Sequence, residues 1–221
     1  GSSVELGENL EIGYFEQEIK GENKNTCIEE IWEEFPSMSQ YEVRSALAKC
    51  GLMTKHIESL MKVLSGGEQA KVRLCKLINH ETNLLLLDEP TAGLDPKERV
   101  RFRNLISAFS KDRIVILSTH IVSDVEFIAE DIIMMKDGQI LHFGKTQEIT
   151  TEIDGQVWEC TVPTSRAEQY SETLNISNLR NIENNCTVLR VISEQSPMEN
   201  AIKVEPTLED LYLFYFKGVN E

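Results

Sequence analysis

Several kinds of segment are missing from these 221 residues. No apolar run approaches the roughly twenty residues that a membrane-spanning helix needs, and no charged-then-apolar leader opens the chain, so we expect a soluble protein that does not insert into a membrane. Acidic residues outnumber basic ones, and the net charge of −15 argues against a broad basic surface for nucleic acid. The five cysteines are widely spaced and include no C-x-x-C pair, which predicts neither disulfides nor a zinc site.

The sequence also lacks the phosphate-binding loop G-x-x-x-x-G-K-[ST]. Its nearest imitation is GQILHFGKT at residues 138–146, where five residues instead of four separate the two glycines. This segment begins in a predicted hairpin turn at Asp137-Gly138, so we reject it as a phosphate loop. Because such a loop supplies most phosphate ligands, we expect this chain alone to bind nucleotide phosphates weakly or not at all.

The most informative stretch that is present runs from Leu64 to Asp95. Ser65 and Glu68 form a capping box, which predicts that a helix begins at Ser65. Gly66 and Gly67 leave backbone N–H groups open to close approach at the positive end of that helix, an arrangement that suits a phosphate. The predicted buried face of the helix consists of Ala70, Leu74, Leu77 and Ile78.

Two predicted strands end in polar residues. Four leucines, residues 84–87, lead into Asp88 and Glu89 before Pro90 stops the strand. This pattern predicts a central parallel strand that delivers two acids to the carboxyl edge of a sheet, where open α/β sheets bind ligands. Residues 113–119 predict another core strand, which ends at His120.

Four motifs in this order resemble the ATPase domain of the ABC (ATP-binding cassette) superfamily. LSGGE resembles the signature motif, LLLLDE the Walker B strand with its glutamate, residues 92–95 the D-loop, and residues 118–120 the H-loop. The segment IGYFEQE, residues 12–18, resembles the Q-loop strand of the ABC-F branch. Taken one at a time, these segments also fit a plain helix cap, a core strand and a buried histidine.

The resemblance implies ATP and Mg²⁺ as cofactors and a role for each matching residue. The implied catalytic residues are Glu89, as general base on the attacking water, and His120, on the γ-phosphate. The implied Mg²⁺ ligands are Asp88 and Gln17. The implied nucleotide-binding residues are Gln17, Ser65, Gly66, Gly67, Glu68 and Asp95. In this family the signature serves a nucleotide held by an opposing domain.

The other elements complete an expected α/β fold: an incomplete P-loop NTPase core of ABC type, a helical subdomain and a small α+β C-terminal unit. Thr26 and Ser39 are expected to cap two helices that end at Pro36 and Gly51, and Asp95 is expected to cap a third in a box closed by Glu98. Strands at 157–162 and 187–192 flank a predicted helix at 165–174, and the aromatic residues of EPTLEDLYLFYF, residues 205–216, are expected to pack as a helix on the sheet of this unit. The expected divisions are 1–25 for the first strand and Q-loop, 26–64 for the helical subdomain, 65–150 for the signature-to-H-loop core and 151–221 for an accessory unit.

The family resemblance changes character along the chain. Up to about residue 83 the sequence is similar to ABC-F proteins, and from residue 84 onward it resembles the ATPase subunit of a bacterial multidrug or antibiotic exporter. The leading hypothesis is an ATP-hydrolysing subunit that pairs with a second ABC domain and a membrane permease on the cytoplasmic face of the membrane. One alternative is a non-hydrolysing partner that lends its LSGGE signature to a complete cassette. Another is a ribosome-associated ABC-F factor, against which the missing tandem cassette counts.

Overall fold

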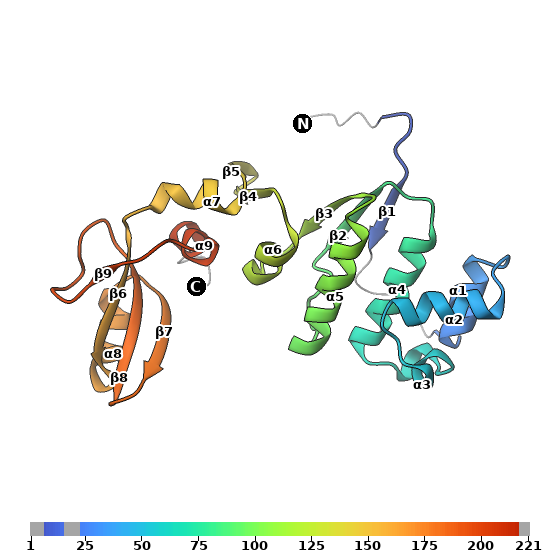
Figure 1. Cartoon of the computed structure of the whole chain (residues 1–221), viewed down its shortest axis with the longest axis horizontal. Coiled ribbons are helices and arrows are strands. Elements are labelled where there is room, and N and C mark those ends of the chain that lie inside the picture. Colours follow the sequence, from blue (N-terminus) through green and yellow to red (C-terminus); the bar gives the residue numbers. More distant parts are fainter. Residues whose placement is uncertain (1–6, 16–22, 217–221) are drawn as a thin grey trace. The chain divides into compact units, whose positions relative to one another are not determined.

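The computed structural model describes residues 7–15 and 23–216, which form two compact units divided between Ile128 and Ala129 (Figure 1). Gln17, the expected ligand of Mg²⁺ and nucleotide, lies outside the described residues. The four-part division expected from the sequence is finer than these two units and stays a prediction. No helix among the described residues is long and apolar enough to cross a membrane.

A three-stranded parallel sheet organises the first unit (Figure 1). The order is β1 (Ile12–Phe15), β2 (Leu84–Asp88) and β3 (Ile114–Ser118), and β2 pairs with both neighbours. The leucine run therefore forms the central strand, as predicted. Its Leu85 and Leu87 side chains are buried together with apolar residues of α4 (Gly66–Asn79) and α5 (Pro96–Phe109).

The opposite face of this sheet carries exposed apolar side chains. Ile114 and Ile116 of β3 are 63% and 53% exposed, so the expectation of a core strand at residues 113–119 is wrong for this face. On β1, Gly13 and Phe15 point inward and Ile12 and Tyr14 point outward. A larger residue at position 13 would displace its neighbours, because a Cβ atom would lie 2.5 Å from Leu77 Cδ1 on α4. Helix α4 can approach β1 closely only where the strand has no side chain.

The helical subdomain begins where its capping residues predict. It comprises α1 (Cys27–Glu34), α2 (Gln40–Lys49), α3 (Thr54–Ile57) and the 3₁₀ turn η1 (Met61–Val63). Thr26 and Ser39 form complete capping boxes with Glu29 and Glu42, which confirms both predicted starts. The subdomain has its own core, in which Ile31, Val43 and Leu47 are fully buried.

Of the two residues expected to close a capping box at the start of α5, one differs from expectation in its partners. Asp95 caps the helix, as predicted, by accepting the Glu98 N–H at 3.0 Å. Glu98 does not close the predicted box, because its carboxylate pairs with Lys71 and Arg101 instead. The cationic partners attract the carboxylate more strongly than a backbone N–H does. After β3 the short helix α6 (Val122–Ile128) completes the first unit.

The second unit begins with a hairpin and continues as a four-stranded antiparallel sheet (Figure 1). The hairpin joins β4 (Ile132–Lys136) to β5 (Gln139–Gly144) through Asp137 and Gly138, both of which have positive φ. The sheet order is β7-β8-β6-β9. The elements after the hairpin are α7 (Thr146–Ile149), η2 (Thr150–Ile153), β6 (Val157–Pro163), α8 (Thr164–Thr173), β7 (Ile176–Ile182), β8 (Cys186–Ile192), β9 (Ile202–Lys203) and α9 (Leu208–Phe216).

The α+β organisation of the second unit agrees with the sequence except at two points. Strand β7 was not expected, because its sequence ISNLRNI shows no apolar alternation. In α9 the expectation was that aromatic side chains pack on the sheet, but the buried residues are Leu208, Asp210 and Leu211. All five cysteines are free thiols, four of them buried, which agrees with the absence of disulfides expected from their spacing.

Candidate functional site

The carboxyl ends of β2 and β3 bring the predicted catalytic residues together. Asp88 is paired in register with Ser118, whose hydroxyl donates a hydrogen bond to Asp88 Oδ1. Glu89, the residue after Asp88, meets His120, two residues after Ser118, and His120 Nδ1 lies 2.7 Å from Glu89 Oε1. Because both strands run in the same direction, residues 30 positions apart in sequence reach the same sheet edge.

Glu89 is held by several contacts in a backbone conformation that few non-glycine residues adopt. Its φ angle is +44°, and its N–H donates to the Ser118 carbonyl at 2.9 Å. Its carboxylate accepts the His120 N–H at 3.0 Å and the Thr119 hydroxyl at 3.2 Å. Strained backbone conformations of this kind cluster at functional sites, where surrounding contacts compensate for the strain. The H-loop therefore fixes the orientation of the predicted general base.

This edge of the sheet is open to solvent. The side chains of His120 and Glu89 are 71% and 24% exposed, and Asp88 is also exposed. No group of three or more His, Cys, Asp or Glu side chains among the described residues is arranged to hold a metal ion. Mg²⁺ is usually bound by one or two carboxylates together with phosphate oxygens and water, so a single exposed Asp88 fits such an ion.

The signature segment forms a second group of predicted site residues. Ser65 caps α4, and the capping box with Glu68 is complete, as predicted. Gly67 is buried against the D-loop. A Cβ atom at this position would lie 3.4 Å from Leu94 Cδ2 and from Glu98 Cγ, so the neighbouring side chains leave little room for one. Lys71, only 2% exposed, pairs with Glu98. The signature helix and the D-loop helix are thus joined by direct packing and a buried ion pair.

Glu68 is held in its ionised form by its surroundings. Its partial burial opposes ionisation, but the hydrogen bonds from Ser65 and the nearby charges of His56 and Lys71 outweigh that effect and hold its pKa below the usual value. His56 Nδ1 lies 2.6 Å from Glu68 Oε1. Each of the other three histidines, His56, His80 and His142, contacts a carboxylate of its own unit.

Sequence reasoning missed a buried carboxylate beside this site. Asp124 of α6 is fully buried and accepts a hydrogen bond from the Thr91 hydroxyl, while Arg103 Nη1 lies 3.5 Å away. Thr91 follows Glu89 by two residues and Asp124 follows His120 by four, so this contact links the loops after β2 and β3. A carboxylate on the apolar face of a short helix was the signal available in the sequence.

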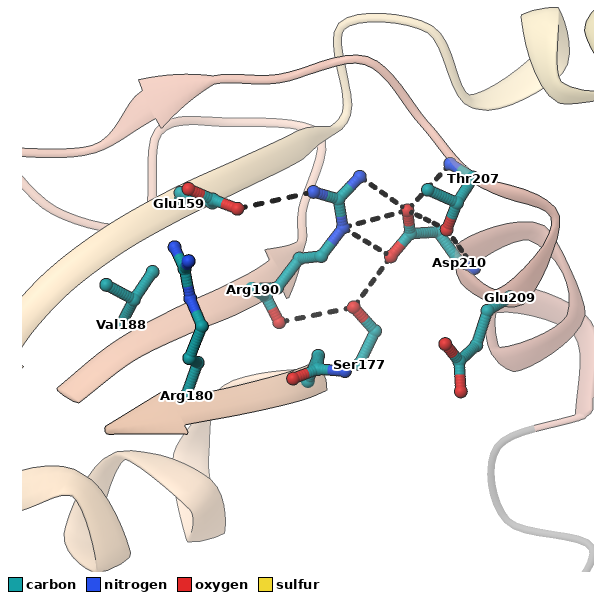
Figure 2. A pocket seen from close by; sticks show the side chains of 9 residues that line it. Glu159, Ser177, Arg180, Val188, Arg190, Thr207, Glu209 and Asp210 are labelled. Carbon is teal, nitrogen blue, oxygen red and sulfur yellow. Dashed lines mark hydrogen bonds and ion pairs between the residues drawn. The ribbon is translucent and has the colours of Figure 1, made fainter. Parts of the chain in front are cut away.

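The second unit contains a different cluster of charged side chains, around a cavity of about 260 Å³ (Figure 2). Arg190 of β8 forms a bidentate ion pair with Asp210 at the start of α9 and also donates to the Glu205 carbonyl. Ser177 of β7 donates to Asp210 at 2.7 Å. Burial opposes ionisation of Asp210, but the hydrogen bonds from Arg190, Ser177 and Thr207 keep its pKa below the usual value.

Comparisons with known proteins agree with the motifs. Residues 6–92 match the family model of the ABC transporter. The chain is 62% identical over 116 residues to the uncharacterized ABC transporter ATP-binding protein YfmM of Bacillus subtilis, a match covering 52% of this chain and 22% of YfmM. It is 36% identical over 104 residues to the energy-coupling factor transporter ATP-binding protein EcfA2 of Enterococcus faecalis, covering 46% of this chain and 36% of EcfA2. The chain thus spans well under two thirds of either relative.

Solved structures agree at the level of the fold. The dimeric structure of MJ0796, a bacterial ABC transporter cassette, is 26% identical and superposes with a TM-score of 0.52 over 62% of this chain and 63% of that one. A dimeric post-hydrolysis state of MJ0796 bound to ADP and Pi superposes with the same TM-score at 24% identity. Together with the geometry of the sheet edge and the signature helix, these findings show that residues 6–92 match the ABC transporter family and that the fold over 62% of the chain is similar to that of ABC transporter cassettes.

Proposed function

We propose that this chain contributes the hydrolytic and signature surfaces of an ATPase in an ABC transport system. The observation that carries the proposal is the contact of Glu89 with His120 beside Asp88 at one exposed sheet edge. In that arrangement Asp88 would hold Mg²⁺, and the ion would supply positive charge to neutralise the phosphate oxygens. Glu89 accepts a proton from the attacking water, and His120 orients that water and contacts the γ-phosphate.

The signature surface serves a second nucleotide in this proposal. Ser65 and Gly66 are exposed at the positive end of α4, where backbone N–H groups can bind phosphate oxygens of an ATP held by a partner domain. Gln17 is the remaining proposed ligand of Mg²⁺ and nucleotide, and Asp95 is proposed to transmit the state of one site to the other. The MJ0796 cassettes, described as dimeric, support a paired arrangement.

We further propose that the system is an exporter whose permease holds this ATPase at the cytoplasmic face of the membrane. The support is the similarity of residues 84 onward to the ATPase subunits of multidrug exporters. The named relatives include energy-coupling factor transporter proteins, so the direction of transport is tested separately. Transport assays in inverted vesicles distinguish the two directions, and ATP-dependent loss of a substrate from such vesicles would contradict export.

The proposal is tested with the polypeptide that the source gene encodes, assembled with its partner domain. Mg-ATP hydrolysis is measured for the wild type, Glu89→Gln and Ser65→Ala. Loss of turnover in both variants is expected, because Glu89 serves one nucleotide and Ser65 the other. Turnover in Glu89→Gln equal to the wild type would overturn the role of Glu89. For the 221-residue chain alone we expect no micromolar binding of Mg-ATP in isothermal titration, because it contains no G-x-x-x-x-G-K-[ST] sequence.

A non-hydrolysing role is the second candidate, favoured by the exposed signature surface at Ser65 and Gly66. In that case the chain only supplies its signature to a complete cassette with a phosphate loop. Mixing the two proteins then restores hydrolysis that depends on Ser65 and is indifferent to Glu89. Dependence on both residues supports the first candidate, and dependence on Ser65 alone supports the second.

A further inference from the structure

The antiparallel sheet of the second unit has two edge strands, and they differ in how well they are protected against pairing with a strand of another molecule. Strand β9 is two residues long, and its Lys203 ammonium lies 5.1 Å from the centre of the Trp158 ring. Strand β7 is seven residues long, pairs with β8 alone among the described strands, and contains neither Lys nor Pro. Proteins protect sheet edges with short strands, charged side chains such as Lys, or Pro, because an open edge presents backbone N–H and C=O groups to other strands. By this criterion β7 is the less protected edge, since it is longer than β9 and its seven residues carry one charge, that of Arg180.

Most of β7 is also accessible. Residues 178–182 are exposed, and the large apolar side chains among them, Leu179 and Ile182, are 51% and 41% exposed. The one irregularity in the pairing of β7 with β8 lies between Ile176 and Asn178, so the pairing is regular from Asn178 to Ile182. A second strand can therefore approach this part of the edge without a bulge in its way.

We propose that two copies of this chain pair through β7 in an antiparallel, two-fold symmetric arrangement centred on Leu179. In this register Leu179 lies opposite the partner's Leu179, and Asn178 lies opposite the partner's Arg180. Apolar side chains meet each other and no like charges are opposed, which favours cross-strand pairing. A register centred on Arg180 would place two guanidinium groups opposite each other. The sequence of β7 is thus self-complementary in one register.

Charge supports a second copy as the partner at this edge. The net charge of −15 per chain opposes association at long range, but the only charged residue of β7 is Arg180. Asn178 and Arg180 line the cavity that also contains Glu159, Glu209 and Asp210 (Figure 2). The proposed register places the partner's Arg180 opposite Asn178, at the rim of this cavity. The cavity of each copy contains three carboxylates and two guanidinium groups. It thereby gains one positive charge from the partner copy.

The expected dimer is weak. One strand pair buries less area than the interfaces of permanent dimers, so association should depend on concentration. It should also be independent of nucleotide, because β7 lies in the unit that holds none of the predicted nucleotide-binding residues. Failure of this inference therefore leaves the proposed ATPase function intact, and failure of the ATPase function leaves this inference intact.

Sedimentation velocity of the 221-residue chain without nucleotide, over a concentration series, provides the test. The wild type should pass from monomer to dimer as its concentration rises. Asn178→Arg places one like charge opposite each of the two Arg180 residues of the dimer and should raise the dissociation constant roughly 3- to 10-fold, whereas Asn178→Glu should lower it by a similar factor. Ile202→Lys, a substitution on the β9 edge, is the matched control and should leave the dissociation constant unchanged. A chain that stays monomeric throughout, or a dimer insensitive to both changes at position 178, would overturn the proposal.

Cross-linking tests the register directly. Opposed residues of antiparallel strands have Cα atoms roughly 4.5–5.5 Å apart, within disulfide range. In a Cys186→Ser background, Leu179→Cys should form a disulfide dimer with diamide, which accepts the two electrons and two protons that the thiols lose. Ile202→Cys should stay monomeric under the same treatment. Equal cross-linking of the two variants would show random collision and contradict pairing through β7.

Discussion

The two clusters of charged side chains in this chain differ in what surrounds them. Glu89 and His120 in the first unit lie at an exposed sheet edge, with 24% and 71% of their side chains accessible. Asp210 and Arg190 in the second unit are 1% and 18% accessible, and their hydrogen bonds go to one another and to neighbouring protein groups. Charged groups that solvent reaches are available to a ligand, whereas buried charges must be paired within the protein. The difference predicts function for the first cluster and stability for the second.

The largest expected effect is a loss of ATP turnover when Glu89, in the first cluster, is changed. Glu89→Gln keeps a side chain that can accept the His120 N–H but removes the base, so ATP turnover in the assembled protein should fall about 10²- to 10⁴-fold. The free energy of unfolding should change by less than about 1 kcal/mol, because the site is exposed. Steady-state hydrolysis and urea unfolding measure the two quantities. Glu126→Gln, a change to an exposed carboxylate on α6, is the control and should affect neither.

Asp210→Ala should lower the free energy of unfolding and leave ATP turnover unchanged. Removing Asp210 breaks a buried ion pair and leaves Arg190 with only the longer contact of its Nη1 to Glu159 Oε1, at 3.4 Å, which costs about 3 kcal/mol in the free energy of unfolding. Turnover should be retained where the unit remains folded. The matched control is Glu209→Ala, since Glu209 is adjacent but exposed, and it should cost less than about 1 kcal/mol. Equal costs for the two variants, measured by urea unfolding, would show that the cluster does not stabilise the unit.

The ion pair of Asp210 with Arg190 also predicts how the stability of the fold depends on pH in acid. The pKa of Asp210 is lower in the folded chain than its ordinary value of 3.8, so the folded state binds that proton more weakly than the unfolded state. Its stabilising contribution is complete above pH 3.8 and is lost as the pH falls through the lowered value. Stability of the wild type should therefore decline more steeply below pH 3.8 than that of Asp210→Asn, in urea unfolding at a series of pH values.

Ser65 tests the distinction between functional and stabilising residues, because it is expected to have both roles. It caps α4, and it is also a predicted phosphate ligand. Ser39 caps α2 with the same geometry and has no predicted ligand. Ser65→Ala and Ser39→Ala should each lower the free energy of unfolding by about 1 kcal/mol. Only Ser65→Ala should also lower turnover in the assembled protein. Equal turnover in the two variants would reduce Ser65 to a capping residue.

Local signals in the sequence predicted the starts of the helices and the position of the central strand. Thr26, Ser39, Ser65 and Asp95 act through atoms within three residues, so their effects can be read from short windows. The meeting of Glu89 with His120 was also predictable, because parallel strands end at the same sheet edge. The assigned roles of Gln17, Asp88, Glu89, Asp95 and His120 remain predictions.

Contacts between distant residues were not predictable from the sequence. Lys71 occupies a buried position because Glu98, 27 residues later, neutralises it, and Asp124 is buried because Thr91 and Arg103 contact it. A helix pattern cannot reveal a partner on another helix. Strand β7 was missed for a similar reason, since pairing with β8 forms it although its own sequence lacks apolar alternation.

The smallest expected effect concerns Tyr215, which links α9 to the start of the second unit. Its hydroxyl donates a hydrogen bond to Glu152 and lies 3.1 Å from His142 Nε2. Burial, together with the hydrogen bond to the Glu152 carboxylate and its negative charge, raises the pKa of Tyr215 to about 12. The folded state therefore holds this proton more tightly than the unfolded state, and the associated stability is complete below pH 10 and lost as the pH approaches 12.

Absorbance of tyrosinate at high pH should show the late titration of Tyr215 in the wild type. In Glu152→Gln its midpoint should fall toward 10, and in Tyr215→Phe it should disappear. An unchanged midpoint in Glu152→Gln would mean that the pair is too exposed to the solvent for the carboxylate to affect the phenol.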